Sequence, residues 1–306
     1  MNVSAVVVTY NRKEMLVECV KTILSQSLSV KTLYIIDNAS TDGTKDELER
    51  KGILADRRVE YCNTGANLGG AGGFYYGLEK AKSDDSDWVW IMDDDVMPEE
   101  DALAELVSHC NDSISYLASC VYGMNGEAMN VPTVNTMNSA SGYPDWYFKL
   151  NDKMIEITSA TFVSLLINKK AILKCGLPCK DYFIWGDDTE YTLRITKYFG
   201  PAYLVGSSKV IHKRKIVHSL RIEKEDNITR INNAFYLFRN RLINAKMYKS
   251  RKDVLLVLIK TIGIACVSLF CPPYNFKKFC IIWKAVFAYF GEWKKYKKYV
   301  NGELEC

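Results

Sequence analysis

Three consecutive aspartates, Asp93 to Asp95, directly follow the apolar run Trp88 to Met92. This run has the composition of a buried strand, so the carboxylates emerge at the end of a strand and not on a solvated helix. Like charges held this close together are unfavourable unless a cation binds them. Asp93 and Asp95, with water and diphosphate oxygens, supply the oxygen-rich shell that Mg²⁺ or Mn²⁺ prefers. We favour this metal site over the alternative, an acidic first turn of a helix that begins at Pro98.

A second acidic group lies beside an aromatic residue, near the start of a predicted amphipathic helix. Aromatic faces stack on sugars, and a neighbouring carboxylate can accept the proton of an attacking hydroxyl. A helix N-cap with an exposed acidic turn explains Asp187 and Asp188 almost as well, so the local pattern leaves both interpretations open. The segment is Trp185-Gly186-Asp187-Asp188-Thr189-Glu190-Tyr191.

The chain contains three histidines, His109, His212 and His218. His109 follows a helical pattern over residues 103–107, so we interpret it as a helix-end residue. His212 ends the strand-like segment that begins at Lys209, where an imidazole could complete a metal shell begun by carboxylates. His218 competes with His212 on local pattern alone, and the residues leave that choice open.

A loop rich in small residues precedes a predicted helix at residues 63–74. Its amides could approach a diphosphate or a sugar closely, as the amides of helix N-termini do. The loop lacks the Gly-Lys-Ser/Thr ending of a P-loop, and its glycines are not in dinucleotide-binding register. We interpret it as a nucleotide-sugar loop, with a tight crossing of helix and strand as the alternative.

The first 95 residues alternate strand-like and helix-like segments. This rhythm predicts an α/β fold with a mostly parallel sheet and helices on both faces. The polar segments 9–12, 37–40 and 93–95 follow strands of this sheet, so they should converge on one cleft beyond the carboxyl ends. The helix over 44–51 has capping-box spacing between Thr44 and Glu47. The predicted strands are residues 3–9, 33–37, 59–62 and 88–92, and the predicted helices are residues 13–28, 44–51 and 70–82.

Residues 96–200 are less regular in pattern. We predict a helix capped by Pro98, a loop-rich stretch from Gly123 to Pro144, a strand near residues 155–167 and a helix that opens near Asp187. The sequence contains no internal repeat and no low-complexity tract.

Charge divides the chain into an acidic body and a basic tail. With 306 residues and 48% hydrophobic content, an ordinary globular core is expected. Residues 201–306 carry 21 Lys and Arg against 7 Asp and Glu, so the rest of this +4 chain is acidic. An acidic body suits a metal site, whereas a basic tail suits an anionic surface. The bulky apolar content of the tail favours an anionic membrane over nucleic acid.

Cysteine usage and the N-terminus indicate the compartment. The ten cysteines include no CxxC pair, and the histidines have no zinc-site spacing. The N-terminus enters a strand at Val3 without a basic stretch or a long apolar region, so no secretory signal is evident. We therefore expect a cytoplasmic protein with reduced thiols.

The tail combines apolar, aromatic and basic residues. Residues 254–271 form an apolar stretch that is borderline for a bilayer span, which needs about 20 such residues. The next segment places aromatic residues at helical spacing beside lysines, as in an interfacial helix on anionic lipid. We favour peripheral docking on the inner face of the cell membrane over a helical subdomain or oligomer contact, and over a true span. The aromatic residues are Phe276, Phe279, Trp283, Phe287 and Phe290, and the lysines include Lys277, Lys278, Lys284, Lys294, Lys295, Lys297 and Lys298.

Four strings, in their order and spacing, resemble family 2 inverting glycosyltransferases with the GT-A fold, a Rossmann-like architecture. The resemblance implies a catalytic domain over residues 1–245, followed by a helical, basic-aromatic, membrane-associating region over residues 246–306. Residues 69–74, 185–190 and 235–240 are most similar to bacterial galactofuranosyltransferases, with rhamnosyltransferases as close relatives. The four strings are Val6-Val7-Val8-Thr9-Tyr10-Asn11-Arg12, Ile36-Asp37-Asn38-Ala39-Ser40-Thr41-Asp42-Gly43, Asn67-Leu68-Gly69-Gly70-Ala71-Gly72-Gly73-Phe74 and Asp93-Asp94-Asp95.

The resemblance also implies roles for residues that local pattern leaves open. It makes Asp188 the general base and puts the metal-binding histidine some two dozen residues later, which favours His212 over His218. It implies Mn²⁺ or Mg²⁺ at Asp93, Asp95 and His212. The implied donor-binding residues are Thr9, Arg12, Asp37, Asn67, Gly70 and Asp94, with Asp37 at the uracil or thymine. The implied acceptor-binding residues are Trp185, Asp187 and Glu190.

The activity that the resemblance implies is a single in-line displacement that inverts the anomeric centre. The sugar would be galactofuranose from UDP-galactofuranose, and the acceptor a hydroxyl of a lipid-linked glycan in bacterial surface polysaccharide synthesis. dTDP-rhamnose is the second choice of donor. A noncatalytic nucleotide-sugar-binding scaffold is a rival interpretation, as is a nucleotidyltransferase, although the N-terminus lacks the glycine-rich basic loop that the latter needs. Self-association into a homo-oligomer is left open.

Overall fold

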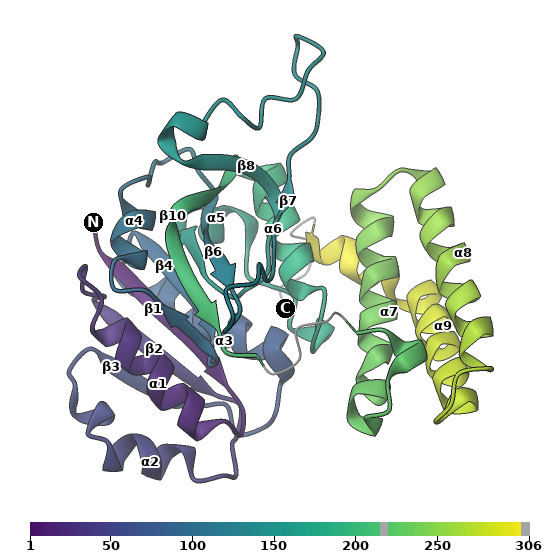
Figure 1. Cartoon of the computed structure of the whole chain (residues 1–306), viewed down its shortest axis with the longest axis horizontal. Helices are drawn as coiled ribbons and strands as arrows, with labels where there is room; N and C mark the ends of the chain where they lie inside the picture. The colour runs from purple at the N-terminus through teal and green to yellow at the C-terminus, as the bar shows by residue number, and fades with distance from the viewer. Residues whose placement is uncertain (215–219, 301–306) are drawn as a thin grey trace.

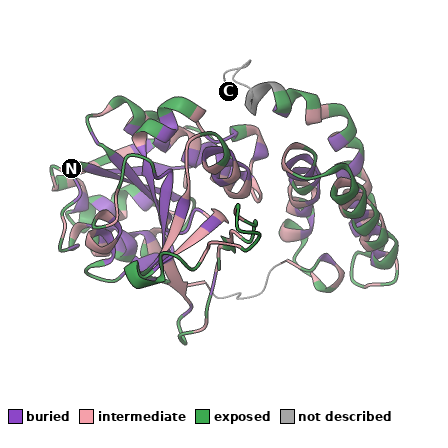
Figure 2. Ribbon diagram, turned by 90° about the horizontal axis from the view of Figure 1, so that it is seen from above, coloured by how far each residue is buried: buried purple, intermediate pink, exposed green. Residues whose placement is uncertain are grey.

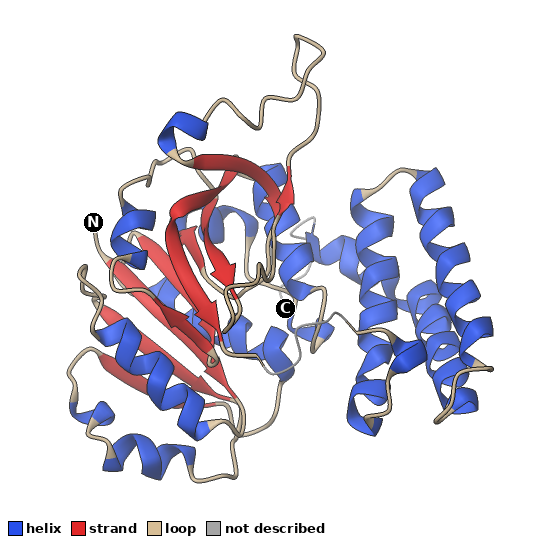
Figure 3. Ribbon diagram, in the orientation of Figure 1, coloured by secondary structure: helices blue, strands red, loops and turns tan. Residues whose placement is uncertain are grey.

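The computed structural model describes residues 1–214 and 220–300. Within them the chain forms an α/β unit built around one sheet and a C-terminal unit of helices beside it (Figures 1 and 3). His218, one of the two candidate metal-binding histidines, lies outside the described residues.

Parallel strands joined by helices make up the first third of the chain. The strands lie in the order β3-β2-β1-β4, and each neighbouring pair is parallel. Every element predicted in this part is present. The elements are β1 (Val3–Thr9), α1 (Lys13–Leu24), β2 (Thr32–Asp37), α2 (Thr44–Arg50), η1 (Ile53–Ala55), β3 (Val59–Asn63), α3 (Gly69–Ser83) and β4 (Trp88–Asp93).

The capping box predicted for α2 is wrong. Gly43, at φ 81°, is the N-cap residue, and Thr44 is already inside the helix. The Thr44 amide and hydroxyl donate to Asp42 Oδ1 at 3.1 and 2.5 Å. The Lys13 amide donates to Asp42 Oδ2 at 3.1 Å. Asp42 therefore takes the capping role and ties the start of α1 to the start of α2.

The second half of the sheet mixes strand directions. Its order continues β4-β9-β6-β10-β8-β7, with β5 also paired to β10. β9 is antiparallel to β4 and β6, whereas β10 is parallel to β6 and antiparallel to β5 and β8. The expected parallel order thus holds from β3 to β4, beyond which the sheet is mixed. The elements are β5 (Val96–Pro98), α4 (Ala102–Val107), β6 (Tyr116–Tyr122), β7 (Thr133–Val134), η2 (Leu150–Asp152), β8 (Met154–Ser159), β9 (Leu165–Asn168), α5 (Lys169–Cys175), η3 (Lys180–Tyr182), α6 (Asp187–Tyr198) and β10 (Ala202–His212).

Two predictions for the middle of the chain are wrong. The strand expected near residues 155–167 is two strands, β8 and β9, which lie at different places in the sheet. Pro98 does not cap a helix, because it ends β5, opposite Val210 of β10, and α4 begins only at Ala102. Both errors arise because pairing with strands far away in the sequence decides these segments.

Apolar side chains pack on both faces of the sheet, and its central strands are the most buried (Figure 2). α3 lies close against β1 because two of its glycines face the strand. A Cβ at Gly73 would lie 2.4 Å from Val8 Cγ1, and one at Gly77 would lie 2.3 Å from Val6 Cγ1. Side chains there would force the helix away from the sheet. The alternative interpretation of the glycine-rich stretch, a tight crossing of helix and strand, holds for these two glycines.

Three helices form the C-terminal unit, in which α9 packs along both α7 and α8 (Figure 1). The predicted domain boundary at residue 245 falls inside α7, close to its end. Across the residues that the structure describes, no helix is both long enough and apolar enough to cross a lipid bilayer. The elements are η4 (Ile222–Lys224), α7 (Ile228–Tyr248), α8 (Arg251–Ser268) and α9 (Asn275–Val300).

Candidate functional site

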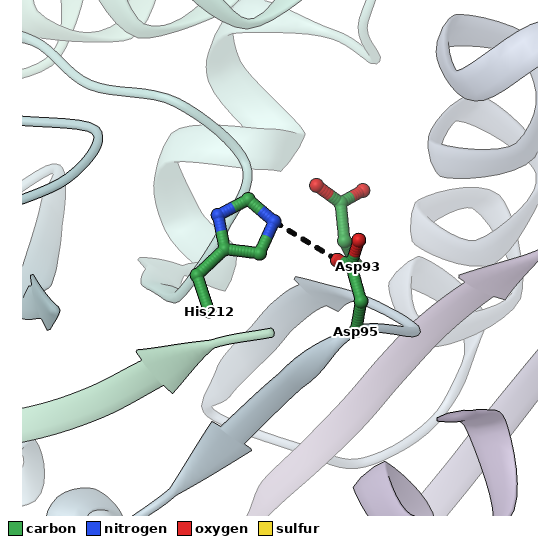
Figure 4. Close-up of side chains that lie close together, drawn as sticks. All are labelled: Asp93, Asp95 and His212. Carbon is green, nitrogen blue, oxygen red and sulfur yellow. Dashed lines mark ion pairs between the residues drawn. The ribbon is translucent and has the colours of Figure 1, made fainter. Parts of the chain in front are cut away.

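The ends of β4 and β10 bring two aspartates and a histidine together (Figure 4). Asp93 is the last residue of β4, Asp95 lies in the turn before β5, and His212 is the last residue of β10. One potential ligand atom of each lies within 4.8 Å of the other two. Because β5 pairs with β10 and Val96 lies opposite His212, the sheet itself sets this spacing. The structure thus brings the three predicted metal ligands to one point.

The donor atoms of this group fit a divalent cation. His212 Nε2 lies 3.0 Å from Asp95 Oδ1, and His212 Nδ1 lies 3.0 Å from Asn130 Oδ1. With oxygens at both ring nitrogens, either the imidazole carries two protons or a cation lies at the Nε2 side. Asp95 Oδ1 is buried, and within residues 1–214 and 220–300 no well-aligned hydrogen bond reaches it, although His212 Nε2 lies close. Leaving such an oxygen without a donor is unfavourable, and a cation shared with His212 would relieve it.

Burial and charge crowding shift the pKa values of these aspartates. Burial, followed by the charges of Asp95 and Asp94, raises the pKa of Asp93 well above its ordinary value. Burial also raises the pKa of Asp94 to about 6, against the effect of Arg12. For Asp95, burial acts upward, but hydrogen bonds and charges from His212 and Arg12 lower the pKa below its ordinary value. Protons and a cation therefore compete for the Asp93 carboxylate.

Asp94 holds two of the predicted donor-binding residues in place. Thr9 Oγ1 donates to Asp94 Oδ2 at 2.7 Å, and Arg12 Nη1 donates to Asp94 Oδ1 at 3.1 Å and to Asp95 Oδ2 at 2.7 Å. Both oxygens of Asp94 are engaged within the protein, and the residue is 3% exposed. The Asp94 carboxylate therefore positions Thr9 and Arg12, and its own contact with the donor stays a prediction. Thr9 is itself buried, whereas the Arg12 side chain is half exposed.

A cavity of about 540 Å³, here called the basic cavity, lies beside the metal-ligand group. Its wall includes Arg12, Asp95 and Trp185, three of the residues predicted for the site. Four cationic side chains face it, against the carboxylates of Glu14 and Asp95, so it favours an anionic ligand such as a diphosphate. The cationic residues are Arg12, Lys213, Arg214 and Arg230.

Asp37 ends β2 and lines a separate cavity of about 350 Å³, together with Tyr61. Its Oδ2 accepts from the Tyr61 hydroxyl at 2.5 Å, and its Oδ1 accepts from the Ser40 amide at 2.8 Å. Burial and the hydrogen bond to Asp37 raise the pKa of Tyr61 to about 12. Asp37 therefore fixes the Tyr61 ring at the cavity wall, and its contact with a nucleobase stays a prediction.

The first turn of α6 brings two further carboxylates to the site. The negative charge of Asp187 adds to the rise in the pKa of Asp93, so this turn lies near the metal-ligand group. Burial, followed by the charge of Asp188, raises the pKa of Asp187 to about 8, and burial also raises the pKa of Asp188. Asp187 is 6% exposed, which rules out a purely solvated acidic turn.

The backbone that leads into α6 has an unusual conformation. Phe183 and Trp185 have φ values of 63° and 61°, and Gly186 has 92°. A left-handed conformation is unfavourable by roughly 1 kcal/mol for a residue with a side chain, so surrounding contacts must hold it. Asn240 of α7, which is fully buried, supplies them: its Nδ2 donates to the carbonyls of residues 182, 184 and 185 at 3.0, 3.2 and 2.7 Å.

Two more residues of α7 complete this support. Asn244 Nδ2 donates to the Gly186 carbonyl at 2.8 Å, and Asn244 Oδ1 accepts from the Tyr182 hydroxyl at 2.7 Å. Arg239 Nη2 donates to the Asp181 carbonyl at 2.8 Å, and Arg239 Nε donates to Asn240 Oδ1 at 3.0 Å. The helical unit thus fixes the segment that carries Trp185 and the acidic turn.

Glu190 is held by partners within the protein, and its predicted contact with the acceptor stays a prediction. This residue is 1% exposed, and its carboxylate accepts from Arg194 Nε at 3.1 Å and from Arg194 Nη2 at 2.9 Å. The Tyr248 hydroxyl of α7 also donates to Glu190 Oε1 at 2.7 Å. Glu190 is a structural residue that joins α6 to α7, because its charge is buried only in the company of these partners.

The loop that carries Asn67 and Gly70 supports the segment before α6, and the donor contacts predicted for these two residues stay predictions. Asn67 Oδ1 accepts from the Gly69 amide at 2.9 Å, and the Ala71 amide donates to the Phe183 carbonyl at 3.1 Å. A Cβ at Gly69 would lie 2.1 Å from the Phe183 carbonyl oxygen, so residue 69 must be glycine for the loop to pack against the segment before α6. In the described chain, neither Asn67 nor Gly70 lines the basic cavity or the cavity at Asp37.

Sequence reasoning missed several residues at the site. Asn130, which orients His212, lies in a loop that carries no periodic pattern. Lys213 and Arg214 directly follow His212, and this basic pair was the available signal for an anion-binding wall. His109 lies just beyond the end of α4, as expected for a helix-end residue.

Comparisons with known proteins agree with this architecture. The family model described as Glycosyl transferase family 2 matches residues 4–174, more than half of the chain. The sequence is similar to galactofuranosyltransferase GlfT1 of Mycolicibacterium smegmatis, with 31% identity over 108 residues, 35% of this chain and 34% of that protein. It is also similar to GlfT1 of Mycobacterium tuberculosis, with 24% identity over 201 residues, 64% of this chain and 65% of that protein. The chain thus spans about a third and just under two thirds of the length of these relatives.

Among solved structures, the fold is similar to that of GalNAc-T7 with UDP, GalNAc and Mn²⁺, with a TM-score of 0.62. The match covers 95% of this chain and 56% of that chain at 14% sequence identity. A likeness at this identity concerns the fold, and it confirms the predicted GT-A class of α/β architecture.

Proposed function

Because the chain belongs to glycosyl transferase family 2, we propose that it transfers a sugar from a nucleotide diphosphate donor to a hydroxyl of a glycan acceptor, inverting the anomeric centre. The observation that supports this most is the position of Asp93, Asp95 and His212 beside the basic cavity. A site for a cation next to a wall of cationic side chains suits the diphosphate of a sugar nucleotide.

For the donor we propose UDP-galactofuranose, and for the acceptor a lipid-linked glycan of bacterial surface polysaccharide synthesis. The similarity to two proteins named galactofuranosyltransferase supports this choice. dTDP-rhamnose is the second candidate donor.

A donor panel tests the proposal. UDP-galactofuranose, UDP-galactopyranose and dTDP-rhamnose are each supplied with Mn²⁺ or Mg²⁺ and a synthetic lipid-linked acceptor, and released UDP and dTDP are measured. We expect acceptor-dependent release of UDP from UDP-galactofuranose alone. Release from dTDP-rhamnose alone would reassign the donor, and UDP binding without release from any donor would favour a noncatalytic scaffold.

The residues on the donor side have separate roles in this proposal. Asp93, Asp95 and His212 would hold Mn²⁺ or Mg²⁺, which when bound neutralises negative charge on the leaving diphosphate. Arg12, held by the carboxylates of residues 94 and 95, contacts phosphate oxygens in the basic cavity. Asp37 and the Tyr61 ring that it fixes contact the nucleobase.

The residues on the acceptor side belong to the segment that α7 supports. Asp188 accepts the proton of the attacking hydroxyl, and the Trp185 ring stacks on the acceptor sugar. Burial and the charge of Asp188 raise the pKa of Asp187 to about 8, which favours the protonated form of this carboxyl at neutral pH.

Asn240→Ala is expected to lower kcat on the order of a hundredfold, with a much smaller change in the KM for the donor. The alanine removes the amide that holds three carbonyls of the strained segment, so Trp185 and Asp188 lose their positions. Steady-state kinetics and the thermal unfolding midpoint are measured together. Asn232→Ala, an exposed asparagine of the same helix, is the matched control. A folded Asn240→Ala protein with normal kcat would contradict this positioning role.

We also propose that α8 and α9 hold the protein on the inner face of the cell membrane. Large apolar side chains lie on both helices, and each is more than half exposed. Exposed lysines lie among them, which suits anionic lipid. The apolar residues are Leu255, Leu256, Ile259 and Val267 on α8 and Phe276, Phe287 and Phe290 on α9, and the exposed lysines include Lys252, Lys260, Lys277 and Lys284.

Binding to vesicles that contain phosphatidylglycerol is expected to fall at least about tenfold in the double variant Leu256→Glu/Phe287→Glu. Each change removes an apolar side chain that lipid would bury. Flotation with anionic and with neutral vesicles measures the effect. Leu173→Glu, an equally exposed leucine on α5, is the control. Equal binding of both variants would contradict lipid docking. If the double variant lost self-association in sedimentation velocity, this surface of α8 and α9 would instead be an oligomer contact.

A further inference from the structure

A third cavity, of about 800 Å³, is lined by residues of α3, α7, α9 and the segment before α6. It is here called the aromatic cavity, because rings from all of these elements line it. Clefts between structural units are common ligand sites. The rings are those of Tyr75, Tyr76, Phe183, Tyr236 and Tyr296.

Two ion pairs neutralise four of the five charged side chains that line the aromatic cavity. Arg239 Nη1 lies 3.4 Å from Glu292 Oε2, and Lys295 forms an ion pair with Asp181. Lys180 Nζ lies 4.8 Å from the centre of the Tyr75 ring. The basic cavity has an excess of cations, whereas these charges nearly balance. The aromatic cavity is therefore suited to a neutral ligand rich in hydroxyl groups and not to a diphosphate.

The aromatic cavity is joined to the site by one short segment. Phe183 lines the aromatic cavity, and Trp185, two residues later, lines the basic cavity. Asn240 holds the backbone of this segment from α7. The Phe183 ring stacks on Tyr236 of α7, with centroids 4.8 Å apart. A chain-like ligand that crosses this segment would touch both cavities at once.

We propose that the aromatic cavity binds the body of the acceptor glycan, the sugar residues beyond the one that receives the new sugar. The inference rests on the proposed transfer to a glycan and adds a second binding site to it. Flat faces of sugar rings pack on aromatic side chains, and paired charged groups offer fixed hydrogen-bond donors and acceptors to hydroxyls. Contacts far from the reacting hydroxyl improve its positioning, so long acceptors gain over short ones.

Saturation-transfer NMR and calorimetry test the proposal. The ligands are synthetic galactofuranose and rhamnose tetrasaccharides, the matching monosaccharides and UDP. The double variant Tyr75→Ala/Lys180→Ala should bind a tetrasaccharide roughly tenfold more weakly and leave UDP and monosaccharide binding unchanged. The control is Tyr198→Ala/Lys197→Ala, which removes a similar pair on α6, with Lys197 Nζ 5.2 Å from the Tyr198 ring.

The outcomes separate this inference from the proposed function. Wild-type protein that binds neither tetrasaccharide, or variant protein that binds one as tightly as wild type does, overturns the inference. Selective loss of tetrasaccharide binding supports it, even if no donor is turned over in the panel described above. Donor turnover without tetrasaccharide binding would support the proposed transferase activity and contradict the second binding site.

Discussion

Asp188→Asn is expected to lower kcat for glycan transfer by roughly a hundred- to ten-thousandfold, with donor binding nearly unchanged. The asparagine keeps the size of the side chain and can still accept from the Thr189 amide, which donates to Asp188 Oδ1 at 2.6 Å. It cannot take up the proton of an attacking hydroxyl. Initial rates of UDP release with and without acceptor measure the effect.

Asp187→Asn is the matched control, because it removes a neighbouring carboxyl from the same helical turn. The pKa of Asp187 is about 8, so this group is protonated at neutral pH and an amide replaces it with a smaller loss than at residue 188. If Asp187→Asn caused the large loss and Asp188→Asn a mild one, the base would be Asp187 instead.

Removal of the cation is the second change with a large expected effect. Chelation should abolish transfer, and Mn²⁺ or Mg²⁺ should restore it. Asp95→Asn should lower kcat/KM by roughly a thousandfold, because a bound metal contributes several kcal/mol of charge stabilisation.

Asn130→Ala should weaken Mn²⁺ binding only about tenfold to a hundredfold, since Asn130 acts through His212, and excess Mn²⁺ should restore activity. Asn125→Ala, in the same loop, is the control.

The pH dependence of metal binding provides a check on the same prediction. The raised pKa of Asp93 means that the metal-free protein loses stability as the pH rises from the unfolded value of about 4 through the folded value. A cation relieves that loss, so the rise in Tm caused by Mn²⁺ should be larger at pH 8 than at pH 6. A metal-independent transfer rate, or a Tm that Mn²⁺ does not change at either pH, would contradict the assigned site.

The first third of the fold could be predicted because its information is local. The strands and helices between Val3 and Asp93 have distinct periodicities and polar ends, and parallel connections leave little choice of topology. The position of β9 between β4 and β6 could not be predicted, because it depends on pairing with residues about 50 to 80 positions away.

The site shows the same division. The apolar strand that precedes Asp93 indicates the acidic group. The role of His212 was predicted from the spacing that the family resemblance implies. Asn130 carries no local signal, because its role depends on one hydrogen bond between distant segments. Glu190 pairs with the buried Arg194 one helical turn later, and a sequence pattern does not distinguish that pair from an exposed one.

Anomalous scattering from crystals grown with Mn²⁺ and UDP tests the central claim most directly. One manganese peak is predicted within coordination distance of Asp93, Asp95 and His212, in contact with the UDP diphosphate at the wall that holds Arg12. A manganese ion bound elsewhere, or UDP bound away from this group, would contradict it.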